Sequence, residues 1–97
     1  MRLEFHRQVA SDISRIMGYY EDVGGRQLAD EFYNELRAFF QKAAEHSESF
    51  AIHGRDFRRV NLEKFPYHFL FRIVEDRVRI LVVRHHKRRP SLGLGRR

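Results

Sequence analysis

The stretch from Tyr67 to Val83, YHFLFRIVEDRVRILVV, decides the fold of this 97-residue chain. Before and after Glu75 and Asp76, apolar residues recur at a period of two, and most of them are β-branched or aromatic, as is typical of strands. The two acidic residues leave room for little more than a tight turn. The stretch is therefore predicted to be an antiparallel hairpin.

A two-residue turn at Glu75–Asp76 also predicts which residues face each other across the hairpin. The expected pairs are Val74–Arg77, Arg72–Arg79, Leu70–Leu81 and His68–Val83. Because Arg72 and Arg79 repel each other in that register, an acidic group is expected to lie near them.

The same register separates the hairpin into two faces. The nearly apolar face, on which the helices are predicted to pack, carries Tyr67, Phe69, Phe71, Ile73, Val78, Ile80 and Val82. The mixed face is named the open face, and it is predicted to carry His68, Leu70, Arg72, Arg79, Leu81, Val83 and His85. Polar contacts with a partner are therefore expected on the open face.

Two amphipathic helices are predicted before the hairpin, because apolar residues there recur at spacings of three and four. The first stripe consists of Val9, Ile13, Ile16, Met17 and Tyr20, and the second of Leu28, Phe32, Leu36, Phe39, Phe40 and Ala43. Gly24 and Gly25 interrupt the pattern, and the second helix is expected to end near His46. The acidic residues of both helices are interpreted as solvated: Asp12, Glu21, Asp22, Glu31 and Glu35.

Short strands are also predicted at Arg2–Phe5 and from Phe57, where the sequence reads FRRVNL. The element order is then βααβββ. Since neither the helix pair nor the sheet can bury its apolar side alone, the predicted fold is α+β, with a two-helix hairpin packed on one face of a small, mostly antiparallel sheet. Residues 1–90 are expected to form this single domain, and residues 91–97, SLGLGRR, a flexible basic tail.

Composition narrows the class of protein. Hydrophobic residues make up 42% of the chain, which favours a folded domain over disorder. The chain has no Cys, so neither a disulfide framework nor a thiolate site is possible. No apolar run is long enough to span a membrane and the first residues do not resemble a signal peptide, so a cytoplasmic protein without a membrane partner is expected.

The formal net charge of +6 favours a polyanionic partner, either nucleic acid or a strongly acidic protein. The cations concentrate after residue 54: Arg55, Arg58, Arg59, Arg84, Lys87, Arg88 and Arg89. As a group they are expected to rim one end of the open face. The alternative, an ordinary solvated charge, stays open for any one of them.

Three short motifs stand in the last third of the chain: FPY at Phe65–Tyr67, FR at Phe71–Arg72, and H-x-x-R-x-P formed by His85, Arg88 and Pro90. Together with the βααβββ order they resemble the ParE/RelE superfamily of toxins from type II toxin–antitoxin systems, over about residues 2–90. The resemblance implies a growth-inhibiting toxin, ParE-like or of the plasmid stabilisation type. A cognate antitoxin would hold it inactive in a hetero-oligomer.

The resemblance leaves two targets open. ParE-like members poison DNA gyrase and are not known as enzymes, whereas RelE-like members are endonucleases that cut mRNA on the ribosome. The motifs favour the gyrase alternative, and so do Ser91 and Leu92, which follow Pro90 where RelE-like members often carry a terminal Tyr. A degenerate, non-toxic fold retained only for binding is a third alternative.

Cleavage of RNA needs a group that moves protons and cations that stabilise the developing charge. For a ribonuclease, the candidate catalytic residues are Arg58, Arg72, His85 and Arg88, with His68 as a second candidate for proton transfer. For binding of the target, or of an acidic C-terminal antitoxin segment, the candidates are Arg58, Arg59, Arg72, Arg79, His85, Arg88 and Arg89. No cofactor is expected, and no metal, because His85 and His86 are adjacent on a strand and point to opposite faces.

Overall fold

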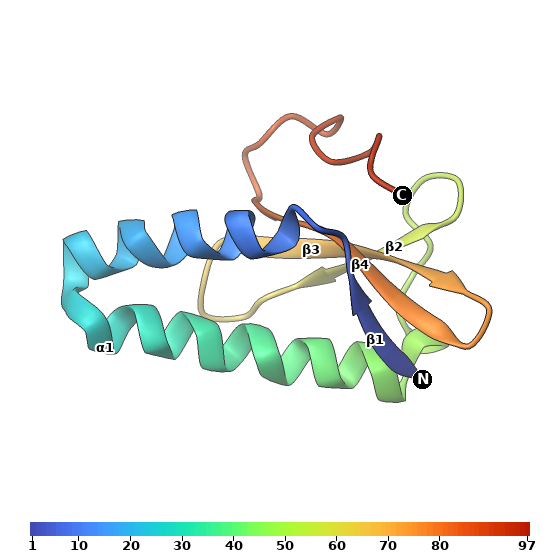
Figure 1. Cartoon of the computed structure of the whole chain (residues 1–97), viewed down its shortest axis with the longest axis horizontal. Coiled ribbons are helices and arrows are strands. Elements are labelled where there is room, and N and C mark those ends of the chain that lie inside the picture. Colours follow the sequence, from blue (N-terminus) through green and yellow to red (C-terminus); the bar gives the residue numbers. More distant parts are fainter.

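The computed structural model describes all residues from Met1 to Arg97. Its elements are β1 (Arg2–Phe5), α1 (Val9–Glu45), the short 3₁₀ helix η1 (Ser47–Ser49), β2 (Phe57–Asn61), β3 (Tyr67–Val74) and β4 (Arg77–His85). Figure 1 shows α1 on one side of a single sheet. The predicted α+β class is confirmed.

The helix α1 consists of two arms that meet at Gly25. Gly25 has a φ of 81°, which a residue with a side chain adopts only with strain, so the chain can reverse there. In Figure 1 the two arms run antiparallel beside each other, which is the predicted two-helix hairpin. Each arm buries one stripe against the sheet, with Ile16 and Tyr20 from the first arm and Phe32 and Leu36 from the second.

The sheet has the strand order β1-β4-β3-β2. Strands β2, β3 and β4 pair antiparallel, and β1 joins the edge of β4 in parallel. The turn between β3 and β4 places Glu75 at a φ of 58°, the left-handed conformation that two-residue hairpin turns require at their first position. The sheet is thus mostly antiparallel, as predicted.

A cluster of 17 buried hydrophobic residues fills the space between α1 and the sheet. Aromatic rings meet edge to face at its centre, with centroids 4.7 Å apart for Phe40 and Phe69 and 5.4 Å apart for Phe32 and Phe65. Burying each such side chain contributes about 1.5–3 kcal/mol. No helix is both long enough and apolar enough to cross a membrane.

The predicted register holds only for the half of the hairpin next to the turn. Arg72 faces Arg79, but the pairing shifts between Leu70 and Phe71, so that Leu70 pairs with Val82. One extra residue of β4, Leu81, forms a β-bulge there. The expected Leu70–Leu81 and His68–Val83 pairs are therefore wrong, and His68 faces Arg84 instead.

The bulge exchanges the faces of the residues that follow it. Leu81 and Val82 both pack with Leu70 on the open face, whereas Val83 joins the main core under α1. The assignments of Val82 to the helix-packed face and of Val83 and His85 to the open face are wrong for the same reason.

The C-terminal segment covers part of the open face. Leu70, Leu81 and Val82 are at most 1% exposed. A Cβ atom on Gly93, whose φ is 86°, would lie 2.6 Å from the Cβ of Val82. Figure 1 shows the segment (red) turning back from the end of β4 over the sheet. The flexibility expected of residues 91–97 stays a prediction.

Candidate partner-binding face

The open face is organised around the facing arginines Arg72 and Arg79. Glu4 of β1 accepts hydrogen bonds from Arg79 Nε and, at 2.7 Å, from Arg77 Nη1. The bond from Arg79 lowers the pKa of Glu4, so its carboxylate stays charged beside the arginines. On the other side, Asp56 Oδ2 lies 3.1 Å from Arg72 Nε. The acidic groups expected near the two arginines are therefore present.

Arg72 is the less completely satisfied of the two arginines. Its Nε is buried and has no aligned hydrogen-bond acceptor, although Asp56 is close, so that contact is electrostatic only. The side chain of Asp56 is 62% exposed and is easily displaced. Beside Arg72 lies a hollow of about 490 Å³ whose lining includes Phe57, Arg55 and, from the C-terminal segment, Arg97. A carboxylate entering this hollow would meet three arginines.

Farther along the open face, His68 is held between Arg84 and His86. Arg84 Nε donates to His68 Nε2 at 2.8 Å, so the proton of a neutral His68 must sit on Nδ1, which is 2.9 Å from His86 Nδ1. Burial, reinforced by Arg59 and Arg84, lowers the pKa of His68 to about 3. His68 is therefore a neutral link in a hydrogen-bonded chain and cannot supply a proton near neutral pH.

Arg84 anchors the C-terminal segment. The sequence groups it with the basic residues expected at the rim of the open face and does not predict this structural role. Its Nη1 donates to the carbonyl oxygens of Arg89 at 3.3 Å, Pro90 at 2.8 Å and Leu92 at 2.7 Å. Burial, and after it the nearby charge of Arg59, lowers the pKa of Arg84. Since Nη1 carries two hydrogens, at least one hydrogen is shared between two of these carbonyl groups.

Two of the predicted site residues lie on the other side of the sheet. Arg58 pairs with Phe71 of the core and donates from Nη1 to the carbonyl of Phe50 at 2.7 Å. The ring of His85 lies edge-on to Tyr67 with centroids 5.0 Å apart. The expectation that Arg58 and His85 lie on the open face is therefore wrong. Arg58 is adjacent in β2 to Arg59, which is on the open face, so its side chain points to the opposite face. The bulge in β4 moves His85 to that same opposite face.

The remaining predicted residues divide between two places. Arg59 is on the open face, where its Nε donates to Asn61 at 2.8 Å and its Nη2 lies 3.4 Å from His86. Arg88 and Arg89 follow β4 and are exposed. Arg88 lines a second hollow, of about 280 Å³, with His85 and residues of the first arm of α1. Arg59, Arg72 and Arg79 therefore share the open face, and Arg88 is outside it.

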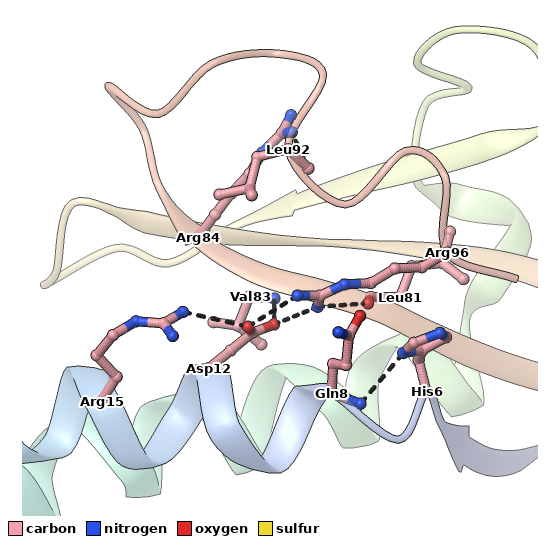
Figure 2. A network of polar contacts seen from close by, with 9 residues as sticks. All are labelled: His6, Gln8, Asp12, Arg15, Leu81, Val83, Arg84, Leu92 and Arg96. Atoms are coloured by element: carbon pink, nitrogen blue, oxygen red, sulfur yellow. Dashed lines mark hydrogen bonds and ion pairs between the residues drawn. The ribbon is translucent and has the colours of Figure 1, made fainter.

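Asp12 is buried, which corrects its interpretation as a solvated helix residue. It is 2% exposed, and its carboxylate accepts bonds from the Val83 amide at 3.1 Å and from Arg96 at 2.6 and 3.1 Å. Figure 2 shows these contacts together with that of Arg15, at 3.3 Å. The sequence does carry a signal, because Asp12 lies on the same helical stripe as the buried Val9 and Ile16.

The candidate catalytic residues do not form one group: His85 and Arg88 line the same hollow, whereas Arg72 lies elsewhere on the sheet. His85 pairs with Tyr67 at one end of β3, and Arg72 is five residues farther along that strand. At the usual rise of a strand, these positions are separated by about 17 Å. Because His85 and Arg72 also lie on opposite faces of the sheet, no single phosphate group can contact both.

Comparison with known proteins decides the family. The family model described as the ParE toxin of the type II toxin–antitoxin system, parDE, matches residues 3–90. The chain belongs to the ParE toxin family. This ParE-family protein is 29% identical over 91 residues to Toxin ParE2 of Mycobacterium tuberculosis strain H37Rv, covering 93% of the chain and 86% of that relative. It is therefore the toxin component of a type II toxin–antitoxin system, and toxins of this type pair with an antitoxin.

Two solved structures share the fold of this ParE-family toxin. A chain from the chromosomal ParDE system of Pseudomonas aeruginosa superposes with a TM-score of 0.79 at 20% identity, covering 88% of this chain and 95% of that one. The isolated RelE toxin of Escherichia coli superposes with a TM-score of 0.65 at 14% identity, covering 96% and 92%. At these identities the likeness concerns the fold alone.

Proposed function

We propose that this ParE-family toxin inhibits growth by poisoning DNA gyrase, acting as a binding protein in the cytoplasm. The observation that carries the proposal is the placement of His85 and Arg72 on opposite faces of the sheet, which leaves Arg88 as the one candidate catalytic arginine beside His85. A ribonuclease must bring a proton-transfer group and phosphate-binding cations to one phosphate. Tyr67, which pairs with His85, and Arg72 are about 17 Å apart along β3, which favours binding over RNA cleavage.

The state of His68 supports the same choice. Its pKa of about 3 leaves it uncharged near neutral pH, and both of its nitrogens are engaged, one by Arg84 and one by His86. Arg84, its partner, is occupied by carbonyl groups of the C-terminal segment. His68 therefore does not supply a free acid or base to the open face.

The cognate antitoxin, in this proposal, neutralises the toxin by laying an acidic C-terminal segment on the open face. Arg72 supports this, because its buried Nε lacks an aligned acceptor and its neighbour Asp56 is exposed. A carboxylate from the antitoxin would replace Asp56 and satisfy the guanidinium with charge-assisted hydrogen bonds. Arg79 is already bound by Glu4 and contributes mainly through its charge.

Purified toxin, released from its antitoxin, tests the target directly. Added to gyrase, relaxed plasmid and ATP, the toxin should inhibit supercoiling and accumulate cleaved DNA, and equimolar antitoxin should restore activity. The same preparation should leave mRNA intact on translating ribosomes. Unchanged supercoiling together with cut mRNA would replace the gyrase proposal with the RelE-like alternative.

Two simpler experiments test the remaining alternatives. Gel filtration of the co-expressed toxin and antitoxin should give one shared peak, and two separate peaks would contradict the neutralising complex. Expression of the toxin alone should arrest growth. Normal growth at a verified level of folded protein would instead indicate a degenerate fold retained for binding.

A further inference from the structure

A hollow of about 280 Å³ opens at the C-terminal end of β4, between the first arm of α1 and the C-terminal segment. Three arginines line it: Arg15 of α1, Arg84 near the end of β4, and Arg88 after it. None of the lining residues is acidic. A concave site that carries charge of one sign concentrates the electrostatic potential and attracts ions of the opposite sign. The hollow therefore suits an anionic group.

The charges of these arginines are not balanced within the fold. Asp12 is the one carboxylate in contact with Arg15, but Arg96 binds it at 2.6 and 3.1 Å, whereas its contact with Arg15 is 3.3 Å long (Figure 2). The side chain of Arg15 is 60% exposed, so its guanidinium can turn toward a ligand. The hydrogen bonds of Arg84 go to neutral acceptors, and Arg88 makes no ion pair. Four arginines thus share one carboxylate, and a bound anion would offset the excess.

Two further side chains of the hollow suit a nucleotide unit. Nδ1 of His85 accepts from the amide of Lys87 at 3.0 Å, so the hydrogen of the neutral ring lies on Nε2, which is left to donate to a phosphate oxygen. Tyr19 lines the hollow but is 56% exposed, so it stands at the rim. Cations for the phosphates beside an exposed aromatic ring for a base are the combination with which proteins bind single-stranded nucleic acid.

We propose that this hollow binds a phosphodiester group of a single nucleic-acid strand, with a neighbouring base stacked on Tyr19. Arg15 and Arg88 contact the phosphate oxygens, and Arg84 adds its charge while it keeps the carbonyl groups that it holds. The site is separate from Arg72 on the open face, where the acidic antitoxin segment is proposed to bind. The proposal concerns contact with nucleic acid itself and does not depend on gyrase.

A nucleic-acid strand fits the hollow better than an acidic peptide does. A strand carries a charged phosphate at every nucleotide and a flat base beside each one, so it meets the arginines and the exposed ring of Tyr19 together. The side chain of an acidic residue supplies the charge but no flat surface for that ring. DNA and RNA share the required chemistry, and the probes below distinguish them.

Fluorescence anisotropy with a short labelled oligothymidylate tests the site on the purified full chain, freed of antitoxin. The wild type should bind the probe saturably at low salt. Arg88→Gln should weaken binding about tenfold and reduce the slope of log K against log salt by about 0.7, the value for one phosphate contact on a single strand. Arg26→Gln is the control, because it removes the same charge from an exposed residue at the tip of α1, and should change the affinity less than about twofold.

Thermal unfolding checks that both arginine variants fold. If the wild type shows no saturable binding, or if the two variants lose equal affinity, the proposed site is wrong.

Tyr19→Ala tests the contact with the base. It should weaken binding of oligothymidylate about fivefold or more, because one stacked base is lost. Tyr33→Ala is the matched control, since Tyr33 is also an exposed tyrosine but lies on the second arm of α1. A duplex of the same length offers no unpaired base, so Tyr19→Ala should leave its weaker binding unchanged. Equal losses from the two tyrosine variants, or tighter binding of the duplex than of the single strand, would contradict the stacked arrangement.

Two other probes identify the source of the ligand. Oligouridylate should bind with the same dependence on Arg88 and stay intact, because the hollow places one histidine beside the phosphate, whereas cleavage needs both a base and an acid. Tighter binding of the DNA or of the RNA probe assigns the source. Cleavage of the RNA would contradict the gyrase proposal but leave the phosphate site standing, so the two proposals fail separately. Polyglutamate that binds as tightly, with the same loss in Arg88→Gln, would show a site for acidic peptides and overturn the inference.

Discussion

Asp12 and Arg96, 84 residues apart in the chain, complete the edge of β4 where β1 ends. Strand β1 pairs with β4 only as far as Ile80. Beyond that point the Val83 amide donates to Asp12 at 3.1 Å, and Arg96 donates to the Leu81 carbonyl at 3.0 Å, while the two side chains bind each other at 2.6 Å (Figure 2). A buried ion pair therefore takes the place of a neighbouring strand at the bulge.

Replacing Asp12 by Ala should destabilise the fold. The substitution leaves the Val83 amide and the guanidinium of Arg96 without an acceptor, and losing one partner of a mostly buried charged pair costs about 3 kcal/mol. Urea unfolding measures the change in the free energy of unfolding. Asp30→Ala, an exposed carboxylate on the second arm of α1, is the control and should change it by less than about 0.5 kcal/mol. Similar losses in both variants would contradict the role of Asp12.

Gly93→Ala should release the C-terminal segment from the sheet. Its φ of 86° is strained for Ala, and the new Cβ would collide with Val82. Amide hydrogen exchange should therefore speed up at Leu94 and Arg96, whose amides donate within the segment. Gly95→Ala is the matched control, because a Cβ atom added there would have no other atom within 4 Å and the φ of Gly95 is not in the positive range. Fast exchange already in the wild type would instead support the flexibility predicted for residues 91–97.

The stability of the fold should fall below pH 6.5 because of His68. Its pKa is 6.5 in the unfolded chain and about 3 in the fold, so the unfolded chain binds the proton first as the pH drops. The stabilising contribution is complete above pH 6.5 and should shrink by about 1 kcal/mol between pH 7 and pH 5.5. Urea unfolding across this range checks it. His68→Asn, which keeps a donor and an acceptor but does not titrate, should show a shallower slope, and an unchanged slope would contradict the assignment.

Charge reversal at Arg72 should weaken the antitoxin complex. Arg72→Glu places a carboxylate where the acidic segment is proposed to bind, and losing a hydrogen-bonded charge pair of this kind costs about 2 kcal/mol or more, which is at least tenfold in Kd. Arg37→Glu is the control, because Arg37 lies on the second arm of α1 with its guanidinium 5.9 Å from the ring of Tyr33. Calorimetric titration with the antitoxin segment measures both. Equal effects would show that the open face is not the binding surface.

The fold could be predicted from the sequence because each element carries a long periodic signal. The alternation of β3 and the stripes on both arms of α1 gave the right element types, and the acidic pair Glu75–Asp76 gave the right turn. The bulge gave no such signal, since Leu81 and Val82 stand in a run of four apolar residues in which a shift of one position leaves the pattern unchanged.

The site was harder to predict than the fold, and the bulge is the main reason. A one-residue shift moves every later side chain to the opposite face, so His85 was placed with Arg72 although it lies under α1. Arg58 differs for another reason: the sequence pattern groups it with Arg59 at the rim of the open face, but adjacent residues of a strand point to opposite faces, and the carbonyl of Phe50 accepts from Arg58 on the core side. The pair Asp12–Arg96 depends on a contact between the two ends of the chain, which local patterns cannot predict.

Pulse-labelling of new DNA and new protein within minutes of inducing this toxin alone in bacterial cells tests its target most directly. If gyrase is poisoned, DNA synthesis should fail first while translation continues, and co-induction of the antitoxin should prevent the failure. Arg72→Glu induced with the antitoxin should still arrest DNA synthesis, if that variant remains toxic by itself. Collapse of protein synthesis before any loss of DNA synthesis would contradict the gyrase proposal and indicate a toxin that cleaves mRNA.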